Sequence, residues 1–322
     1  MPQFSRTTLA LVLSTSLLAA CGGGGSGGTP TAATPVSSAP VFTSANYTAV
    51  AATAWASSDS FTTNTDKLNT GGTVGGGARA ASLPDQANTI ANAANQLARS
   101  FPVLNQSFSE ACPSGGSMSG HLSMNTTRTL SSGGKFDFSG NNCVVDSVSF
   151  NGKLAMDINI SSGGNLDTTL VFSSLTMGNG GDKVMMDGDS KLLLNNGKTT
   201  VSGTRLKMTV TRDGKQLYDR TLSNYSYSYG QTAANSMSLN GSVTTTHSTL
   251  GSINFNVQTT NSFITSTSGY PQSGSMLVSS GGSTVKLTAL GGNAIKVELS
   301  EKGDGVINQT QTLTYEQLKA LQ

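Results

Sequence analysis

The sequence predicts a mainly β protein with a large, curved, antiparallel up-and-down sheet that forms a half-barrel or a barrel. Two helices from the N-terminal part are expected to pack on this sheet, and a short helix follows at the C-terminus. Aromatic residues make up only 6% of the 322 residues, while Gly, Ser, Thr and Asn are abundant, and this composition favours strands and turns. From about residue 116 onward apolar and polar residues alternate, as in half-buried strands.

The alternation is clearest where apolar side chains occur at every second position. Leu154, Met156 and Ile158 alternate with polar residues in the segment 153–160. The same pattern recurs in the segments 204–210, 253–257, 285–287 and 295–299. Two-residue turn signals are found at 151–152, 163–164, 196–197, 213–214, 240–241, 281–282 and 304–305. Asn-Gly and Asp-Gly suit hairpin turns, so we expect twelve to fourteen strands, and a sheet of more than about ten strands must curl or close.

Residues 44–102 are predicted to be helical, with a Gly-rich loop between two helices at 45–56 and 83–101. The first carries apolar residues at helical spacing, namely Tyr47, Val50, Ala51, Ala54 and Trp55. The second carries a matching stripe, namely Ala87, Ile90, Ala94, Leu97 and Phe101. At the other end of the sheet region, 103–322, Thr314 and Gln317 predict a capping box, with Leu318 and Leu321 on the apolar face of the last helix.

The N-terminal sequence indicates where in the cell the protein is located. Residues 1–20 contain Arg6 and then an apolar run, which is typical of a secretory signal peptide. The run ends in Leu18-Ala19-Ala20-Cys21, which closely resembles the lipobox of bacterial lipoproteins. The resemblance implies that the Cys21 thiol receives a diacylglycerol, that cleavage occurs before it and that the new amino terminus is acylated. Gly22 in place of an aspartate implies retention in the outer membrane.

The segment 21–43 is predicted to be a flexible tether that holds the domain away from the membrane. It contains no charge and almost no large apolar residue up to position 40, so it cannot bury enough surface to fold. Residues 24–28 match the Gly-x-Ser-x-Gly pattern of hydrolases, but that pattern needs a strand before it and a helix after it. We therefore assign it no catalytic role.

The number of cysteines and the net charge restrict the disulfide pairing and the class of partner. With Cys21 lipidated, Cys112 and Cys143 remain, and in an oxidising compartment an even pair predicts a disulfide. Charged residues are 11% of the chain and the net charge is +2, so we expect no nucleic-acid partner.

Two longer stretches carry a second resemblance. Residues 112–156 contain Cys-x-x-Gly-Gly, Asn-Cys and Asn-Gly-x-Leu, and residues 268–306 contain Tyr-Pro-x-Ser-Gly and an Asp-Gly turn. Both stretches are similar to segments of uncharacterised Gram-negative lipoproteins with a Gly-rich tether. That family has no assigned activity to carry over to this chain.

Catalytic and metal-binding residues are not evident in the sequence. His121 and His247 each stand alone on a predicted strand, where a polar-face role is expected rather than a general base. Asp187 and Asp189 suggest a calcium loop, but the next alternate position is Lys191, a cation that no such loop accepts. We expect solvated turns there, no metal, no cofactor and no enzymatic activity.

A run of tyrosines is the candidate binding face. Tyr225, Tyr227 and Tyr229 share one side of a predicted strand, and tyrosine is enriched at binding surfaces. The alternative is that the three rings cover the sheet or pack on a helix.

These observations predict an outer-membrane lipoprotein, facing the periplasm or the cell exterior, that is bound to the membrane through Cys21. Its expected role is non-enzymatic, either structural or in binding a protein or glycan partner. Two alternatives remain open. One is a carrier or sensor of a hydrophobic ligand or lipid, held in the concavity of the curved sheet; this fails if the helices fill that concavity. The other is a surface adhesin.

Overall fold

The computed structural model describes residues 41–59, 105–112, 114–124, 133–145, 148–160, 165–179, 182–195, 198–231, 235–265 and 270–321. The predicted signal peptide, Cys21, most of the predicted tether and the predicted helix at 83–101 lie outside these residues. Fourteen strands and two helices are found in the described part of the chain, and they fall into two compact units.

The first unit is an antiparallel sheet of seven strands that follow one another in chain order. Its strands are β1 (Asn105–Ala111), β2 (Ser117–Met124), β3 (Gly134–Val145), β4 (Val148–Ile160), β5 (Leu166–Asn179), β6 (Asp182–Asn195) and β7 (Lys198–Arg212). Each strand is long, and in β7 the burial alternates, with Leu206, Met208 and Val210 buried. The predicted period of two is therefore confirmed.

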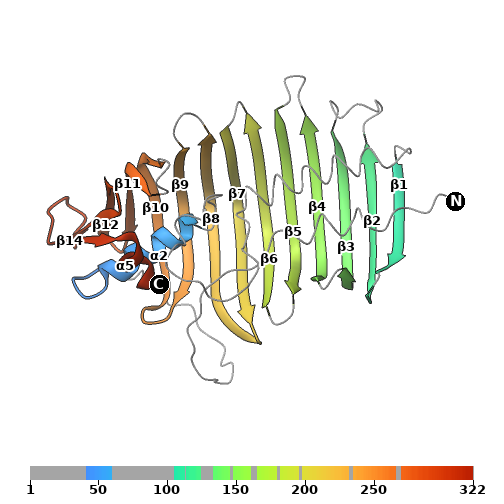
Figure 1. The fold of residues 1–322 in the computed structure, drawn as a ribbon, viewed down its shortest axis with the longest axis horizontal. Coiled ribbons are helices and arrows are strands. Elements are labelled where there is room, and N and C mark those ends of the chain that lie inside the picture. The colour runs from blue at the N-terminus through green and yellow to red at the C-terminus, as the bar shows by residue number, and fades with distance from the viewer. Residues whose placement is uncertain are drawn as a thin grey trace. The chain divides into compact units, whose positions relative to one another are not determined.

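The second unit contains the remaining strands, again neighbours in chain order, and both helices. Its elements are α2 (Tyr47–Asp59), β8 (Lys215–Gln231), β9 (Asn235–His247), β10 (Gly251–Thr265), β11 (Pro271–Ser280), β12 (Ser283–Gly291), β13 (Ala294–Ser300), β14 (Gln309–Thr314) and α5 (Tyr315–Ala320). Figure 1 shows the strands joined as successive hairpins, with α2 and α5 close to each other in this unit. The mainly β, antiparallel, up-and-down fold class is confirmed.

Edge strands show that the sheet is open. Among the described residues β1 pairs only with β2, and β14 pairs only with β13. A closed barrel would give each of them a second partner.

Helix α2 covers the apolar face of the second unit. All five residues of its predicted stripe, from Tyr47 to Trp55, are buried, and the helix contacts β9, β12, β13 and α5. The Trp55 ring packs edge-on against Phe263 at 5.2 Å between ring centroids. Arg220 donates from Nη1 to the Ala56 carbonyl at 3.1 Å, which satisfies one of the carbonyl groups near the end of the helix. The predicted helix at 45–56 is confirmed, and it ends three residues later than expected.

The described part of the chain is packed on the sheet before the predicted tether boundary at residue 43. Phe42 is fully buried, and its backbone N–H donates to Ser283 Oγ at 2.7 Å. The composition of the segment could not reveal that one phenylalanine at its end is packed in the core.

Helix α5 forms as predicted at its start. Thr314 and Gln317 make the capping box, since the Thr314 side chain accepts from the Gln317 N–H and the Gln317 side chain accepts from the Thr314 N–H. Leu318 is buried, as expected. Leu321, predicted to share its face, is exposed because it forms the C-cap after the helix has ended.

Two of the predicted turns are wrong. The Asn-Gly pairs at 151–152 and 240–241 lie inside β4 and β9, where the strand register shifts, whereas 213–214 and 281–282 form turns as predicted. Gly152 has φ 102°, and a Cβ on it would lie 2.3 Å from the Ser174 carbonyl oxygen. Glycine thus takes a positive φ opposite an irregularity of the next strand as well as in a hairpin turn, so the dipeptide alone does not distinguish the two.

Candidate functional site

The predicted tyrosine face is part of the core. Tyr225, Tyr227 and Tyr229 lie on one side of β8, as predicted, but their exposed fractions are 2%, 0% and 7%. They therefore present no surface to a partner, and the binding-face interpretation is corrected. The opposite side of β8 carries Ser226 and Ser228, which are partly exposed, and Ser228 Oγ lies 2.7 Å from Ser238 Oγ on β9.

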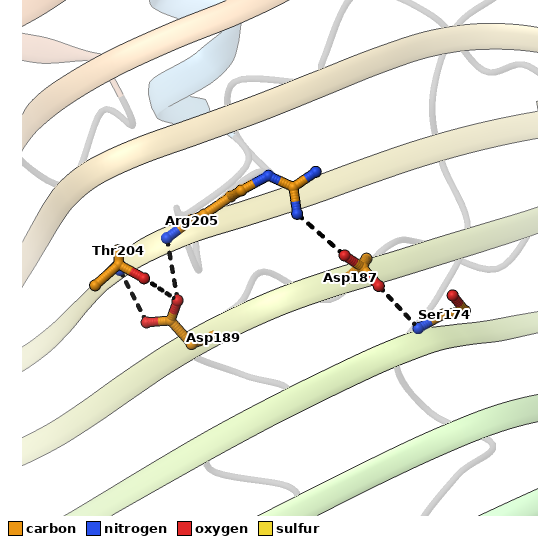
Figure 2. Close-up of polar contacts among 5 residues, drawn as sticks. All are labelled: Ser174, Asp187, Asp189, Thr204 and Arg205. Atoms are coloured by element: carbon orange, nitrogen blue, oxygen red, sulfur yellow. Dashed lines mark hydrogen bonds and ion pairs between the residues drawn. The ribbon is translucent and has the colours of Figure 1, made fainter.

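Polar side chains gather instead on the outer face of β5, β6 and β7 in the first unit. Figure 2 shows the Asp189 carboxylate facing Thr204 and Arg205 on the next strand, β7. Its Oδ2 accepts from the Thr204 N–H at 2.8 Å and its Oδ1 from the Arg205 N–H at 3.1 Å. The Thr204 hydroxyl donates to the same Oδ1 atom. This carboxylate thus accepts three hydrogen bonds from two adjacent residues.

Asp187 on β6 connects Arg205 on β7 to β5, the strand on the other side of β6. Its Oδ1 pairs with Arg205 Nη1 at 3.1 Å, and its Oδ2 accepts from the Ser174 N–H at 3.1 Å. Asp187 and Asp189 were predicted to lie in a solvated turn, but both are inside β6, with Gly188 between them. The side chains of Asp187, Asp189 and Arg205 and the backbone of the neighbouring strands thus link three strands in one network, which is partly exposed to solvent.

The network has a structural cause. The register of β5 with β6 shifts between Phe172 and Leu175, and that of β6 with β7 shifts between Gly188 and Lys191. A bulge leaves backbone N–H groups without ladder partners, and such groups need an acceptor. Partial burial raises the pKa of Asp189, but the hydrogen bonds from Thr204 and Arg205 outweigh it and hold the pKa below its ordinary value.

The same arrangement occurs three times in the described part of the chain. In each case an Asn or Asp that precedes a glycine accepts a backbone N–H from the neighbouring strand. The pairs are Asn142 N to Asn151 Oδ1 at 3.4 Å, Ser174 N to Asp187 Oδ2 at 3.1 Å and Thr259 N to Asn240 Oδ1 at 3.0 Å. These residues therefore brace irregular strand pairs, and they could not have been found as a group without the register.

The network does not supply a cation site. Every carboxylate oxygen of Asp187 and Asp189 already accepts a hydrogen bond. No group of three or more potential metal ligands occurs among the residues that the structure describes. What the outer face offers is exposed hydrogen-bonding groups with opposite charges already paired, as in Lys135–Asp157 and Lys191–Asp167.

A second polar cluster joins α5 to the sheet of the second unit, and sequence analysis missed it. The Glu316 carboxylate accepts from the Tyr270 hydroxyl and from Asn293 Nδ2. Asn293 Oδ1 also accepts from the Tyr315 N–H at 3.1 Å, and the Tyr270 and Tyr315 rings stack with centroids 5.5 Å apart. The partners come from distant parts of the chain, so no local pattern indicates them.

The Glu316 carboxylate is expected to make stability depend on pH. The Tyr270 hydroxyl, and then Asn293, lower its pKa from 4.5 to about 2, against an opposing effect of partial burial. Because the folded-state pKa is below the unfolded value, the stabilisation is present above about pH 4.5 and is lost as the pH falls towards 2. In urea denaturation, E316Q should be less stable than the wild type at pH 7, and the difference should vanish near pH 2.

A matched variant controls for the loss of one negative charge. Glu301 is exposed in the loop that precedes β14, so E301Q removes the same charge without removing the Tyr270 and Asn293 contacts. A deficit for E316Q that persists unchanged at pH 2, or an equal pH-dependent deficit for E301Q, would contradict the assignment.

The two histidines have structural partners. His121 on β2 lies with Nδ1 2.9 Å from Ser107 Oγ, as expected for a polar strand position. His247, also predicted to be on a polar face, is instead buried. Its Nδ1 accepts from the Thr249 and Leu250 N–H groups at 3.1 and 3.3 Å, so Nε2 carries the proton and donates to the Leu321 carbonyl at 2.9 Å. His247 thereby ties the C-terminal end of the chain to β9.

The predicted disulfide pair is at bonding geometry in the first unit. Cys112 follows β1 and Cys143 lies in β3, with Cα atoms 5.4 Å apart and both side chains buried. The backbone around the bridge is also paired, with Ser114 N–H donating to the Val144 carbonyl at 3.1 Å. Cys21, the predicted lipidation site, lies outside the described residues.

Comparisons with known proteins leave the family open: no family model matches the chain, and neither the curated proteins nor the solved structures contain a match. Within the described part of the chain, neither helix is long and apolar enough to cross a membrane. The lipoprotein resemblance therefore remains a prediction from the sequence.

Proposed function

We propose that this protein is a lipoprotein of the outer membrane, anchored through Cys21, with a non-enzymatic binding or structural role in the cell envelope. The observation that carries the proposal is the sequence Leu18-Ala19-Ala20-Cys21 at the end of an apolar run. Two or more acyl chains on one residue anchor a protein firmly, because each buried methylene contributes about 0.8 kcal/mol.

Two features of the structure agree with the proposed location in the cell envelope. The Cys112–Cys143 pair fits an oxidising compartment such as the periplasm. Phe42 is packed in the second unit, and about 20 residues separate it from Cys21, which is a reach of at most about 70 Å. A domain on such a tether stays close to the membrane while its sheet remains accessible to a partner.

The exposed face of the sheet supports a protein or glycan partner. On β9 and β10 the outward positions carry uncharged hydrogen-bonding side chains, namely Thr244, Thr246, Asn254, Asn256 and Gln258. In the first unit, three pairs of opposite charges lie at the surface, namely Lys135–Asp157, Lys191–Asp167 and Arg205–Asp187. A surface of this kind suits neutral or mixed-charge partners and gives no basic track for a nucleic acid.

The carrier alternative is less well supported. A carrier needs an open apolar concavity, which is how ligand sites of this kind are usually built. In the second unit, α2 contacts β9, β12 and β13, and its apolar stripe is buried. Protein side chains therefore occupy that face of the sheet.

Changing Cys21 to alanine tests the proposal directly. The wild type should fractionate with outer membranes and take up labelled palmitate, while C21A should be released into the soluble periplasm or be retained in the inner membrane with an uncleaved signal. The two remaining cysteines are untouched, so the variant domain folds with the same disulfide. Outer-membrane retention and palmitate labelling of C21A would overturn the proposal.

Adding protease to intact cells that express the wild type distinguishes a surface adhesin from a periplasmic protein. Digestion would place the domain on the cell exterior and favour an adhesin, whereas protection would place it in the periplasm. Lysed cells serve as the control that the protease can cut the domain at all.

A further inference from the structure

One loop of the second unit presents apolar side chains to solvent. The loop spans residues 301–308, between β13 and β14, and all of its residues are exposed. Val306 is 61% exposed and Ile307 is 46% exposed. Two adjacent apolar side chains in this position are unfavourable in water and would be stabilised by contact with an apolar medium.

The loop is held in a fixed shape by its own polar groups. Asp304 Oδ1 accepts from the Val306 N–H at 3.0 Å and from the Ser300 hydroxyl at 3.3 Å. Asn308 Oδ1 accepts from the Glu301 N–H at 2.7 Å, and the Asn308 N–H donates to the Leu299 carbonyl at 2.8 Å. Val306 and Ile307 are thus oriented outward by an ordered loop, so little conformational entropy is lost when they are bound.

The chain enters the folded domain at the same end of the second unit. The Phe42 N–H donates to Ser283 Oγ, at the start of β12, and the adjacent turn contains Gly282. Gly303, in the exposed loop, lies against this turn, since a Cβ built on it would be 2.5 Å from the Gly282 carbonyl oxygen. The exposed Val41, which directly precedes Phe42, therefore lies at the end where the loop lies.

We propose that this end of the domain faces the bilayer and that Val306 and Ile307 insert into the lipid surface. The inference rests on the proposed lipid anchor at Cys21, because a tether of about 20 residues raises the effective concentration of the loop at the membrane to the millimolar range. The charges of the loop, Glu301, Lys302 and Asp304, add no net basic attraction. Apolar burial alone supports the contact, and without the anchor it is too weak to hold the protein on a membrane.

A fluorescence experiment tests the orientation. The full-length lipoprotein is purified from a Gram-negative host and reconstituted in vesicles of phosphatidylethanolamine and phosphatidylglycerol with brominated acyl chains, which quench tryptophan. The natural Trp55 is 3% exposed and gives a background that the bilayer does not reach. Ile307→Trp places a reporter in the loop without disturbing the core.

Leu290→Trp is the matched control. Leu290 is 51% exposed and lies near the other end of β12 from Ser283, about 23 Å away at about 3.3 Å per residue. If the loop enters the lipid boundary to about 5–10 Å, the added emission of I307W should be quenched about twofold, while that of L290W and of the wild type should be unchanged. An I307W variant carrying C21A should lose the quenching.

The outcomes separate this inference from the proposed function. If the wild type and both variants float with the vesicles but I307W is not quenched, or is quenched no more than L290W, the orientation is wrong and the anchor stands. If the purified wild type carries no palmitate and does not float with the vesicles, the anchor itself is wrong and the orientation falls with it. Equal circular dichroism spectra of all variants confirm that the substitutions leave the fold intact.

Discussion

Replacing Cys112 and Cys143 together by alanine is expected to lower the free energy of unfolding by about 3–4 kcal/mol. The two residues are 31 positions apart, and in the chain-entropy model a bridge over such a loop restricts the unfolded chain by about this amount. Alanine is chosen because both side chains are buried and a serine hydroxyl there would add the separate cost of an unpaired polar group.

The position of the bridge adds to its importance. β1 is an edge strand that pairs only with β2 among the described residues, and Cys112 follows directly after it. The turn between β1 and β2 is held to β3 by two hydrogen bonds. The Ser114 N–H donates to the Val144 carbonyl, and the Val144 N–H donates to the Gly115 carbonyl at 2.9 Å. Without the bridge, β1 and this turn should open first, which hydrogen exchange of the β1 amides would detect.

Urea denaturation with and without dithiothreitol provides the measurement. The reductant should destabilise the wild type by nearly the same amount as the double substitution, and it should have no effect on the double variant. A loss below about 1 kcal/mol in both the reduced wild type and the variant would mean that the pair is not bridged in the native protein.

Much of the fold could be predicted because it depends on local patterns. The stripe from Tyr47 to Trp55 requires only that every third or fourth residue be apolar, and all of its members are buried. The Thr314–Gln317 capping box depends on residues three positions apart. In β10, the alternation that places Ile253, Phe255 and Val257 on one side is visible in the sequence and is the burial pattern observed.

The features that could not be predicted are the contacts between elements that lie far apart in the sequence. Alternation places the three tyrosines of β8 on one side, but only the packing of the second unit decides that this side is buried. The partners of Glu316 are Tyr270 and Asn293, which no local spacing connects to it. His247 was assigned to a polar face because it stands alone on a predicted strand, whereas it is buried and donates to the Leu321 carbonyl.

The Asp-Gly and Asn-Gly pairs failed for a different reason. A positive φ at glycine occurs in two kinds of element here: in the hairpin turn at 213–214, and at Gly188 inside β6, where the register with the neighbouring strands shifts. The strand length decides between them, because β6 continues to Asn195 beyond the glycine. The braces formed by Asp187 and Asp189 exist only in the second case.

Replacing Gly188 by alanine should therefore be among the most damaging single changes in the first unit, with a cost of about 3–5 kcal/mol. Gly188 has φ 126°, and a Cβ on it would lie 2.0 Å from the Arg205 carbonyl oxygen and 2.9 Å from its carbon. Both atoms belong to the backbone of β7, so no side-chain rotation can relieve the contact. The strand pair would have to separate where Asp189 binds the Thr204 and Arg205 N–H groups.

Gly214→Ala is the control that isolates the close approach from the backbone conformation. Gly214 also has a positive φ, 76°, but it lies in an exposed turn and a Cβ there would meet nothing within 4 Å. Its substitution should cost only about 1–2 kcal/mol, the usual penalty for an L-residue in the left-handed region. Urea midpoints of the two variants give the comparison. If G188A is no less stable than G214A, β6 and β7 are not held this closely at Gly188, and the carboxylates beside it are ordinary surface groups rather than braces.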